Sequence, residues 1–518
     1  MAFANMSFTT LVCLATLFYF LVRKLKPASH PPLPPGPRGW PVIGNALQLG
    51  RFPWMQMTKW YKQFGPIYSL NLGGQTAIVL NHYKVGHELL DKRSAIYSDR
   101  PRMIMPGEIL SGNLFFPFIR YNDDWRRLRK ATWEGLHPRA VQVYHPYLER
   151  EAALLVEALS RDAKNWKAHV NRAVKSAVLA VSYATPPIAS ETDPVVKYID
   201  DFMHRLEHAA RPGEYLVEIF PILAHLPDWA ARWKREGKKA HERDTMEFMG
   251  LYRDAVGRAE RNEAGPSLSA LLMKNPDLSE KEAAWIAGSM FGAGASTTGA
   301  IHLVFILAMT LFPHVLQRAQ QEIDTVIGRG RLPTPGDKDR LPYVRAITRE
   351  VFRWRNIGPL GLPHATSEDD VYEGYFIPKG SIIFVNGWGM ARDPELVPDP
   401  DNFRPERFLD ETGTEDALPP YTHLEGHTAF GYGRRKCIGI NIATDILFTN
   451  VATLLWAFDI KKGKDENGKE VTPDMDDFHD EGLVISPAPF PVEFVPRDPG
   501  VAEMIAKAKE RTEHAHLA

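Results

Sequence analysis

The segment Phe430-Gly-Tyr-Gly-Arg-Arg-Lys-Cys-Ile-Gly439 decides how the rest of the chain is interpreted. It places glycines and basic residues around one cysteine, Cys437, and it leads directly into an apolar run with helical character. Glycines permit sharp turns and a close approach of the backbone to a flat ligand. A cysteine near a helix N-terminus is favoured as a thiolate by backbone N–H groups and by the helix dipole. The segment therefore predicts a thiolate site at a junction between a loop and a helix.

Three other interpretations compete for this segment. A Gly-rich loop that opens a helix can bind phosphate, but the Walker-A spacing and its Lys-Ser/Thr ending are missing here. A nucleophilic cysteine needs a histidine base, and the sequence specifies no particular one. A lone cysteine can also be an inert, buried small residue, so its surroundings must decide.

Composition narrows the class of protein. The chain has 518 residues, a formal net charge of -1 and only two cysteines, Cys13 and Cys437. This cysteine count excludes a disulfide framework and a Cys-rich zinc site. A balanced charge gives no global field for nucleic acid, so we expect no nucleic-acid partner.

The N-terminus predicts a membrane anchor over residues 1–26. Residues 6–22 are almost free of charge, and Arg23, Lys24 and Lys26 follow them. This order favours a single span with a cytosolic body, whereas a signal peptide carries its basic residues before the apolar run. Residues 27–45 are rich in proline and predict a stiff hinge without helix or central strand.

The remaining body, 46–500, predicts one mainly α domain with a minor β part. Strand patterns occupy 67–80, with a turn at Gly73-Gly74, and return at 359–385 and before Pro496. Helical patterns occupy 125–174, 195–211, 227–261, 279–311, 313–328, 337–354 and 441–458. No clear linker divides the body, and 501–518 is expected to be a tail.

The cysteine segment resembles the haem-binding signature of the cytochrome P450 family. It matches the pattern Phe-x-x-Gly-x-Arg-x-Cys-x-Gly at every fixed position, namely Phe430, Gly433, Arg435, Cys437 and Gly439. The order of elements agrees along essentially the whole chain. The resemblance implies the cytochrome P450 fold and a haem b cofactor whose iron takes the Cys437 thiolate as axial ligand. It also implies that Arg435 meets a haem propionate.

Other segments resemble further elements of the same family. Glu350 and Arg353 look like the Glu-x-x-Arg pair, and Arg407 looks like the arginine that joins this pair in a structural network. Trp125 and Arg129 resemble a Trp-x-x-x-Arg element that contacts the propionates. His364 occupies a region that often supplies a further propionate partner, although a satisfied structural histidine explains it equally well.

The predicted helix 279–311 begins with a capping box of Ser279 and Glu282. It contains Ala293-Gly-Ala-Ser-Thr-Thr298, which resembles the oxygen-activating motif of the family. The resemblance implies that Thr297 helps to deliver protons to the oxygen. Ser296 stands where the family usually has an acid, and a serine relays protons through water but does not titrate near neutral pH. Close packing of small residues is the alternative explanation of this stretch.

The resemblance implies a monooxygenase that acts with O2 on a lipophilic small molecule, and the chain looks most like fungal microsomal enzymes of secondary-metabolite biosynthesis. A terpenoid is the first expectation for the substrate, and an aromatic polyketide or an indole comes next. Analogy places Met103, Phe115, Phe291 and Ala295 around the substrate. Electrons would come from NADPH-cytochrome P450 reductase, with cytochrome b5 as a second donor, at the endoplasmic reticulum membrane. A basic face of Arg126, Arg127, Lys130, Arg434 and Lys436 would dock the reductase, or would be ordinary solvated surface. The competing functions are a haem-thiolate isomerase or dehydratase and a non-enzymatic haem-binding or ligand-binding membrane protein.

Overall fold

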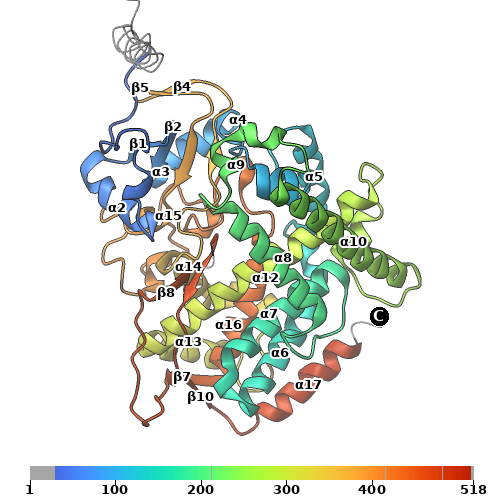
Figure 1. Ribbon diagram of the computed structural model, residues 1–518. Coiled ribbons are helices and arrows are strands. Elements are labelled where there is room, and N and C mark those ends of the chain that lie inside the picture. Colours follow the sequence, from blue (N-terminus) through green and yellow to red (C-terminus); the bar gives the residue numbers. More distant parts are fainter. Residues whose placement is uncertain (1–29, 212, 415, 481, 515–518) are drawn as a thin grey trace, which may run out of the picture.

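A computed structural model describes residues 30–211, 213–414, 416–480 and 482–514. The expected membrane anchor and Cys13 lie outside these residues. In the described part, helices form most of the molecule, and the short strands gather mainly at one side (Figure 1). This agrees with the prediction of a mainly α fold with a minor β part.

The α-helices of the described part are α2 (Pro53–Phe64), α3 (Tyr83–Gly86), α4 (Ser94–Tyr97), α5 (Asp123–Leu136), α6 (His145–Arg161), α7 (Trp166–Tyr183), α8 (Pro194–Ala210), α9 (Leu216–Ile219), α10 (Arg232–Glu260), α11 (Leu268–Leu272), α12 (Glu280–Leu311), α13 (Pro313–Val326), α14 (Pro342–Trp354), α15 (Gly387–Met390), α16 (Ile440–Ala457) and α17 (Val501–His514). The strands are β1 (Ile67–Leu72), β2 (Gln75–Leu80), β3 (His364–Ala365), β4 (Asp370–Tyr372), β5 (Tyr375–Ile377), β6 (Ile382–Val385), β7 (Phe458–Lys462), β8 (Phe478–Asp480), β9 (Ile485–Pro487) and β10 (Val492–Pro496).

Helix α12 runs through the middle of the molecule (Figure 1). It begins with the predicted capping box, in which the Ser279 side chain and the Glu282 side chain satisfy each other's backbone N–H groups. Its residues 283–295 pack with α7, α8 and α10, while residues 300–309 pack with α13, α14 and α16. The small and polar residues 296–299 therefore lie between two hydrophobic cores.

The largest sheet has the strand order β1-β2-β6-β3. Strands β1 and β2 form the predicted hairpin, and Gly73 and Gly74 both have positive φ angles, as a tight two-residue turn requires. Strand β6 pairs with β2 in parallel, so segments about 300 positions apart in sequence lie side by side. Strand β3 pairs with β6 at the edge of this sheet, and its residues His364 and Ala365 are buried.

The proline segment lies against this sheet. The carbonyls of Pro34 and Pro35 accept hydrogen bonds from the hydroxyl and the N–H of Ser69, at 2.7 and 2.8 Å. Proline lacks a donor but keeps its acceptor, so the segment can dock along a strand without joining a regular ladder. The carbonyl of Pro32 accepts the N–H of Phe376 at 2.9 Å, so the expected hinge is attached to the folded body from this residue onward.

Several helix boundaries differ from the predicted ones. The predicted helical stretch 125–174 is divided into α5, α6 and α7, and α7 continues to Tyr183. Helix α14 begins at Pro342, because this proline can occupy a first turn but not a helix interior, and 335–340 form a separate 3-10 turn. Helix α10 begins at Arg232, after the short elements that cover 216–225. The expected tail contains α17, whose Val501, Ile505 and Ala508 are buried in the core.

Two helices of the described part, α12 and α16, are long and apolar enough to cross a membrane. In each, 78% of the apolar window is buried within the molecule. Burial of this extent is typical of core helices in a globular domain, so neither helix supports a membrane span.

Candidate active site

The cysteine loop, α12 and the connection between α14 and β3 enclose a cavity of about 350 Å³. Its wall is largely apolar and includes Phe115 and Phe116 at one side and Ile442 and Ile446 of α16 at another. This volume lies at the lower end of the range for small-molecule sites. Cys437, Thr297 and Arg435 all line it, although they are far apart in sequence.

A hydrogen bond of 2.8 Å closes the cysteine loop, from the N–H of Cys437 to the carbonyl of Phe430. The Phe430 ring packs on Phe352 of α14, with ring centroids 4.8 Å apart. Arg129 of α5 donates to the carbonyl of Lys436 at 2.7 Å. The loop is thus held from both sides, and its cysteine precedes α16 by three residues.

The backbone at position 433 leaves room only for a glycine. Its φ angle is +57°, and a Cβ built there would lie 2.0 Å from the carbonyl oxygen of Leu90. A side chain would therefore separate the loop from the helical turn that contains Leu90. Gly439 lies beside the thiol, since a Cβ there would be 3.9 Å from Cys437 Sγ.

One end of the cavity is strongly cationic, because Arg100, Arg129 and Arg435 all line it. Arg435 lies over the Trp125 ring at 4.2 Å and donates to the carbonyls of Ser98 and Ile119, at 2.7 Å each. Burial and the neighbouring Arg100 lower the pKa of Arg435 to about 8. Burial also lowers the pKa of Arg100, to about 10. Buried cations of this kind require anionic partners.

Arg100 was not among the residues that the sequence analysis selected. It donates to the carbonyls of Leu362 and Pro363, at 2.7 and 2.8 Å, and so fixes the segment before β3. An arginine before a proline in a loop carries no periodic signal, so only the fold shows that it reaches the cavity. His364 also lines the cavity, but its Nδ1 donates to the carbonyl of Tyr97 at 2.8 Å. Burial and Arg100 lower the pKa of His364, which disfavours the second proton that Nε2 needs to donate to an anion.

The residues around the cavity fit a haem group. The Trp125 indole N–H and Nη1 of Arg435 are buried and have no partner within the described part of the chain, and both residues line the cationic end. Two carboxylates, such as the haem propionates, would satisfy these donors. Small residues, Ala293 and Gly294 on α12 and Gly431 and Ala443 opposite, leave room for a flat macrocycle. The thiol of Cys437 is accessible from this space.

The environment of Cys437 acts on its ionisation in two directions. Although the thiol can be reached from the cavity, the surrounding protein desolvates it and raises its pKa, whereas a hydrogen bond from the Gly439 backbone and the charges of Arg129 and Lys436 lower that pKa. Burial is the larger effect. A thiol in this position is poorly ionised by itself, and it becomes a stable thiolate when a metal cation binds it.

Ser296 and Thr297 line the cavity on α12, as expected. The Thr297 hydroxyl donates to the carbonyl of Ala293 at 2.7 Å, and that of Ser296 donates to Gly292 at 3.3 Å. Each hydroxyl keeps lone pairs that can accept a hydrogen bond. Among the described residues of the wall, Glu207 of α8 is the only carboxylate.

The predicted substrate residues separate into two groups. Phe115 lines the cavity, but Phe291, Ala295 and Met103 are absent from its wall and belong to the neighbouring hydrophobic cluster. The cavity face of α12 follows Met290, Ala293 and Thr297, and a helix rotates about 100° per residue. Phe291 and Ala295 consequently lie on other faces of α12, and none of the three residues expected there, Phe291, Ala295 and Met103, lines this cavity.

Glu350, Arg353 and Arg407 form the expected buried network. Glu350 accepts from Arg353 Nε and Nη2 at 2.6 and 2.8 Å and from Arg407 Nε at 3.3 Å. Arg353 also donates to the carbonyls of Ala391 and Pro400. The network ties α14 to the segments 391–407, while Phe352 of the same helix supports the cysteine loop.

The basic residues expected to dock a reductase are largely paired. Arg126 contacts Asp123, Arg127 pairs with Glu282 at 2.6 Å, and Lys436 pairs with Glu425 at 2.7 Å. Arg434 donates to the Tyr121 hydroxyl, and Lys130 is exposed. The net positive charge of this face is smaller than the sequence suggested.

Comparison with known proteins agrees with this geometry. The profile of the family described as Cytochrome P450 matches residues 34–494. Cytochrome P450 monooxygenase 58 of Postia placenta is 48% identical over 499 residues, which cover 96% of this chain and 95% of that protein. A cytochrome P450 monooxygenase of Armillaria gallica is 41% identical over 504 residues, with 96% of each chain covered.

The chain belongs to the cytochrome P450 family, and its relatives of high identity are named monooxygenases. It is therefore an oxidoreductase of the haem-thiolate class. Members of this class use O2, a redox partner and lipophilic substrates.

Proposed function

We propose that the chain is a membrane-anchored monooxygenase that binds haem b through the Cys437 thiolate and oxygenates a lipophilic substrate. One observation carries the proposal: the accessible Cys437 thiol shares an apolar cavity with two buried arginines, Arg100 and Arg435, and the half-buried Arg129. The family relationship supplies the cofactor, and the orphaned donors of Trp125 and Arg435 supply partners for its carboxylates.

Each site residue has a proposed role. Arg435, Arg100 and Trp125 hold the propionates, Arg129 fixes the loop at Lys436, and His364 fixes the strand beside them. Phe430, Gly433 and Gly439 shape the cysteine loop. Haem, when bound, supplies the chemistry of dioxygen activation, which a thiolate ligand promotes.

Thr297 and Ser296 act on protons at the cavity. Because the Thr297 hydroxyl donates to Ala293, its lone pairs accept a hydrogen bond from water. When the hydroxyl rotates away from Ala293, it gives its own proton into the cavity and takes the replacement proton from that water. Ser296 extends this chain by one hydroxyl, without a titratable group. Glu350, Arg353 and Arg407 position α14 and do not touch the reacting atoms.

A substrate with an apolar skeleton and few oxygen atoms fits the wall. The hydroxyls of Ser182 and Ser289 are buried at the cavity and have no partner among the described residues. With Glu207 they provide polar contacts on an otherwise apolar surface. An oxygenated terpenoid has this character, and Phe115 provides an apolar contact.

The remaining proposals concern location and electron supply. Residues 1–26 anchor the protein in the endoplasmic reticulum membrane, and residues 27–45 follow as the hinge. Exposed Leu216, Phe220, Ile222 and Trp229 give the body an apolar surface that suits contact with lipid. NADPH-cytochrome P450 reductase supplies electrons, with cytochrome b5 as a second donor.

The first experiment is the difference spectrum of dithionite-reduced, carbon-monoxide-treated membranes that contain the full chain. A Soret band characteristic of thiolate-ligated haem supports the proposal, while a band typical of histidine ligation would remove Cys437 from the iron. Turnover of a terpenoid panel with reductase follows. Turnover without NADPH would instead favour the isomerase or dehydratase, for which the Ser296 position is the only support.

A further inference from the structure

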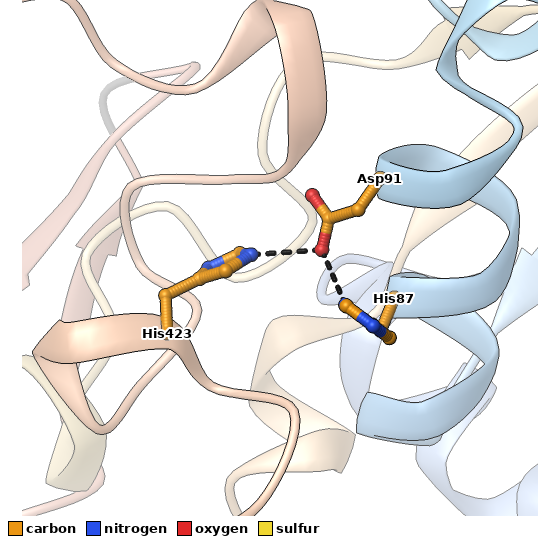
Figure 2. Close-up of side chains that lie close together, drawn as sticks. All are labelled: His87, Asp91 and His423. Atoms are coloured by element: carbon orange, nitrogen blue, oxygen red, sulfur yellow. Dashed lines mark hydrogen bonds and ion pairs between the residues drawn. The ribbon is translucent and has the colours of Figure 1, made fainter.

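Two histidines and one aspartate converge outside the cavity (Figure 2). His87 and Asp91 lie four residues apart on the helical turn His87–Lys92, and His423 comes from the turn His423–Glu425. One oxygen of Asp91, Oδ2, lies 2.8 Å from Nδ1 of His87 and 2.8 Å from Nε2 of His423. All three potential ligand atoms lie within 4.8 Å of one another.

The donor set suits a borderline divalent cation. Two imidazole nitrogens and one carboxylate oxygen make a three-ligand zinc site that leaves a fourth position open. The three side chains keep exposed fractions of 28%, 17% and 24%, so water can reach the site as the fourth ligand. Tetrahedral coordination at about 2.0–2.1 Å places ligand atoms about 3.3 Å apart. The two contacts of Asp91 would open by about 0.5 Å, and the two imidazole nitrogens, which lie within 4.8 Å of each other, would take the same spacing.

The backbone at His423 has an unusual conformation, which places the side chain beside Asp91. His423 has a φ angle of +58°, and Tyr421 has +64°, in a region that non-glycine residues rarely adopt. Such conformations persist where the surroundings over-determine them. The rings of Tyr421 and Tyr432 lie 5.6 Å from His87 and 5.5 Å from His423, respectively, and wall the cluster.

The cluster is also coupled to the cysteine loop. The second oxygen of Asp91 accepts the N–H of Gly433 at 2.7 Å, four residues before Cys437. Asp91 therefore has one oxygen for the loop and one for the histidines. A ligand carboxylate with such an outer hydrogen bond is oriented before the metal binds.

We infer that His87, Asp91 and His423 bind one divalent cation of the zinc class. Binding replaces the two N–H···O hydrogen bonds with nitrogen–metal bonds. A neutral imidazole moves its proton through solvent to the other ring nitrogen, whereas an imidazolium releases one proton to solvent. The cation joins the turn 87–92 to the segment before the cysteine loop and, through Asp91 and Gly433, restrains the loop. This site is separate from the haem iron.

The test uses the full-length, haem-loaded protein in detergent, purified without a histidine tag. Zinc binding is measured by titration calorimetry with ZnCl2 and by metal analysis after dialysis. The variants are His423→Gln and His87→Gln. The matched control is His145→Gln. His145 also pairs with an aspartate, Asp445, at 3.1 Å, but the other partner of Asp445 is Lys338, whose ammonium group does not bind a metal ion.

We expect one zinc ion per wild-type chain and an affinity at least about tenfold weaker in both variants, since even outer-shell changes cost this much. The His145→Gln control keeps wild-type affinity. X-ray absorption at the zinc edge should show two imidazole ligands. The inference is overturned if the wild type binds no stoichiometric zinc, or if His423→Gln and His87→Gln, with normal haem spectra, bind as tightly as the wild type. Either outcome would leave the cluster as a hydrogen-bonded triad.

Discussion

The backbone N–H of Cys437 donates to the carbonyl of Phe430 across 2.8 Å, so the first and eighth residues of the cysteine segment meet. This bond folds the loop back on itself and directs the thiol at the cavity. Because Phe430 packs on Phe352, the position of the thiol depends on α14 as well as on the loop.

Replacement of Cys437 by alanine should abolish the thiolate-type Soret band and all turnover. No other cysteine lies in the described part of the chain, so no second thiolate can take its place there. The reduced, carbon-monoxide difference spectrum measures this directly. Cys13→Ala is the control and should keep both spectrum and activity. An active Cys437→Ala enzyme would refute the central assignment.

Thr297→Ala should consume NADPH without an equivalent amount of product. We expect product per NADPH to fall at least about tenfold, because a positioned proton-transfer group is lost. Thr310 is the matched control, since its hydroxyl also donates to the carbonyl four residues earlier, at 2.8 Å, but it does not line the cavity. Unchanged coupling in Thr297→Ala would remove it from proton delivery.

Arg435→Leu should accelerate haem loss to apomyoglobin by about tenfold or more, because a charge-assisted hydrogen bond contributes about 1.5–3 kcal/mol. Arg434→Leu is the control, since it shows whether loss of a positive charge near the site, without loss of a propionate contact, also accelerates haem loss. Arg434 is exposed and donates to Tyr121 outside the cavity. Equal rates of haem loss in the two variants would argue against a propionate contact of Arg435.

Glu350→Gln should destabilise the fold by about 3 kcal/mol or more, because it leaves the buried charge of Arg353 uncompensated. Chemical unfolding followed by tryptophan fluorescence gives the free energy of unfolding. In the control Glu236→Gln, an exposed i,i+4 pair with Arg232 is lost, and the change should stay within about 0.5 kcal/mol. A similar small change for Glu350→Gln would mean that its network is dispensable.

His302 should make stability fall on mild acidification. Its Nδ1 contacts the carbonyl of Thr298 at 2.6 Å and its Nε2 contacts the Asn450 amide at 2.9 Å, which defines a neutral ring. Burial lowers its pKa from 6.5 to about 4. The folded state therefore binds fewer protons than the unfolded state, and stability that is complete above pH 6.5 is lost as the pH falls toward 4.

Between pH 7 and pH 5 this histidine alone should account for roughly 2 kcal/mol of lost stability. His302→Gln removes the titrating group, so its free energy of unfolding should depend less on pH over this interval. Unfolding titrations at pH 7, 6 and 5 compare the two slopes. Parallel slopes would show that His302 does not carry the acid sensitivity.

The sequence pattern was sufficient to predict those structures whose residues all lie within one short segment. The cysteine segment, the Ser279 capping box and the Gly73-Gly74 hairpin were each predicted correctly as local structures, since every contact that forms them lies a few residues away. The helix boundary at Pro342 shows the limit of periodicity, because a proline at a first turn overrides an amphipathic pattern that extends further back.

The sequence by itself determined that a glycine-shaped loop with one cysteine opens an apolar helix, and that the body is mainly helical. Tertiary structure decided which side chains share the cavity. It brought Arg100 to the cationic end, turned Phe291 and Ala295 away from the cavity and placed His423 against His87 and Asp91. Periodicity specifies which face of a helix is apolar, but the packing of distant elements decides whether that face meets a core, a cavity or a neighbouring loop.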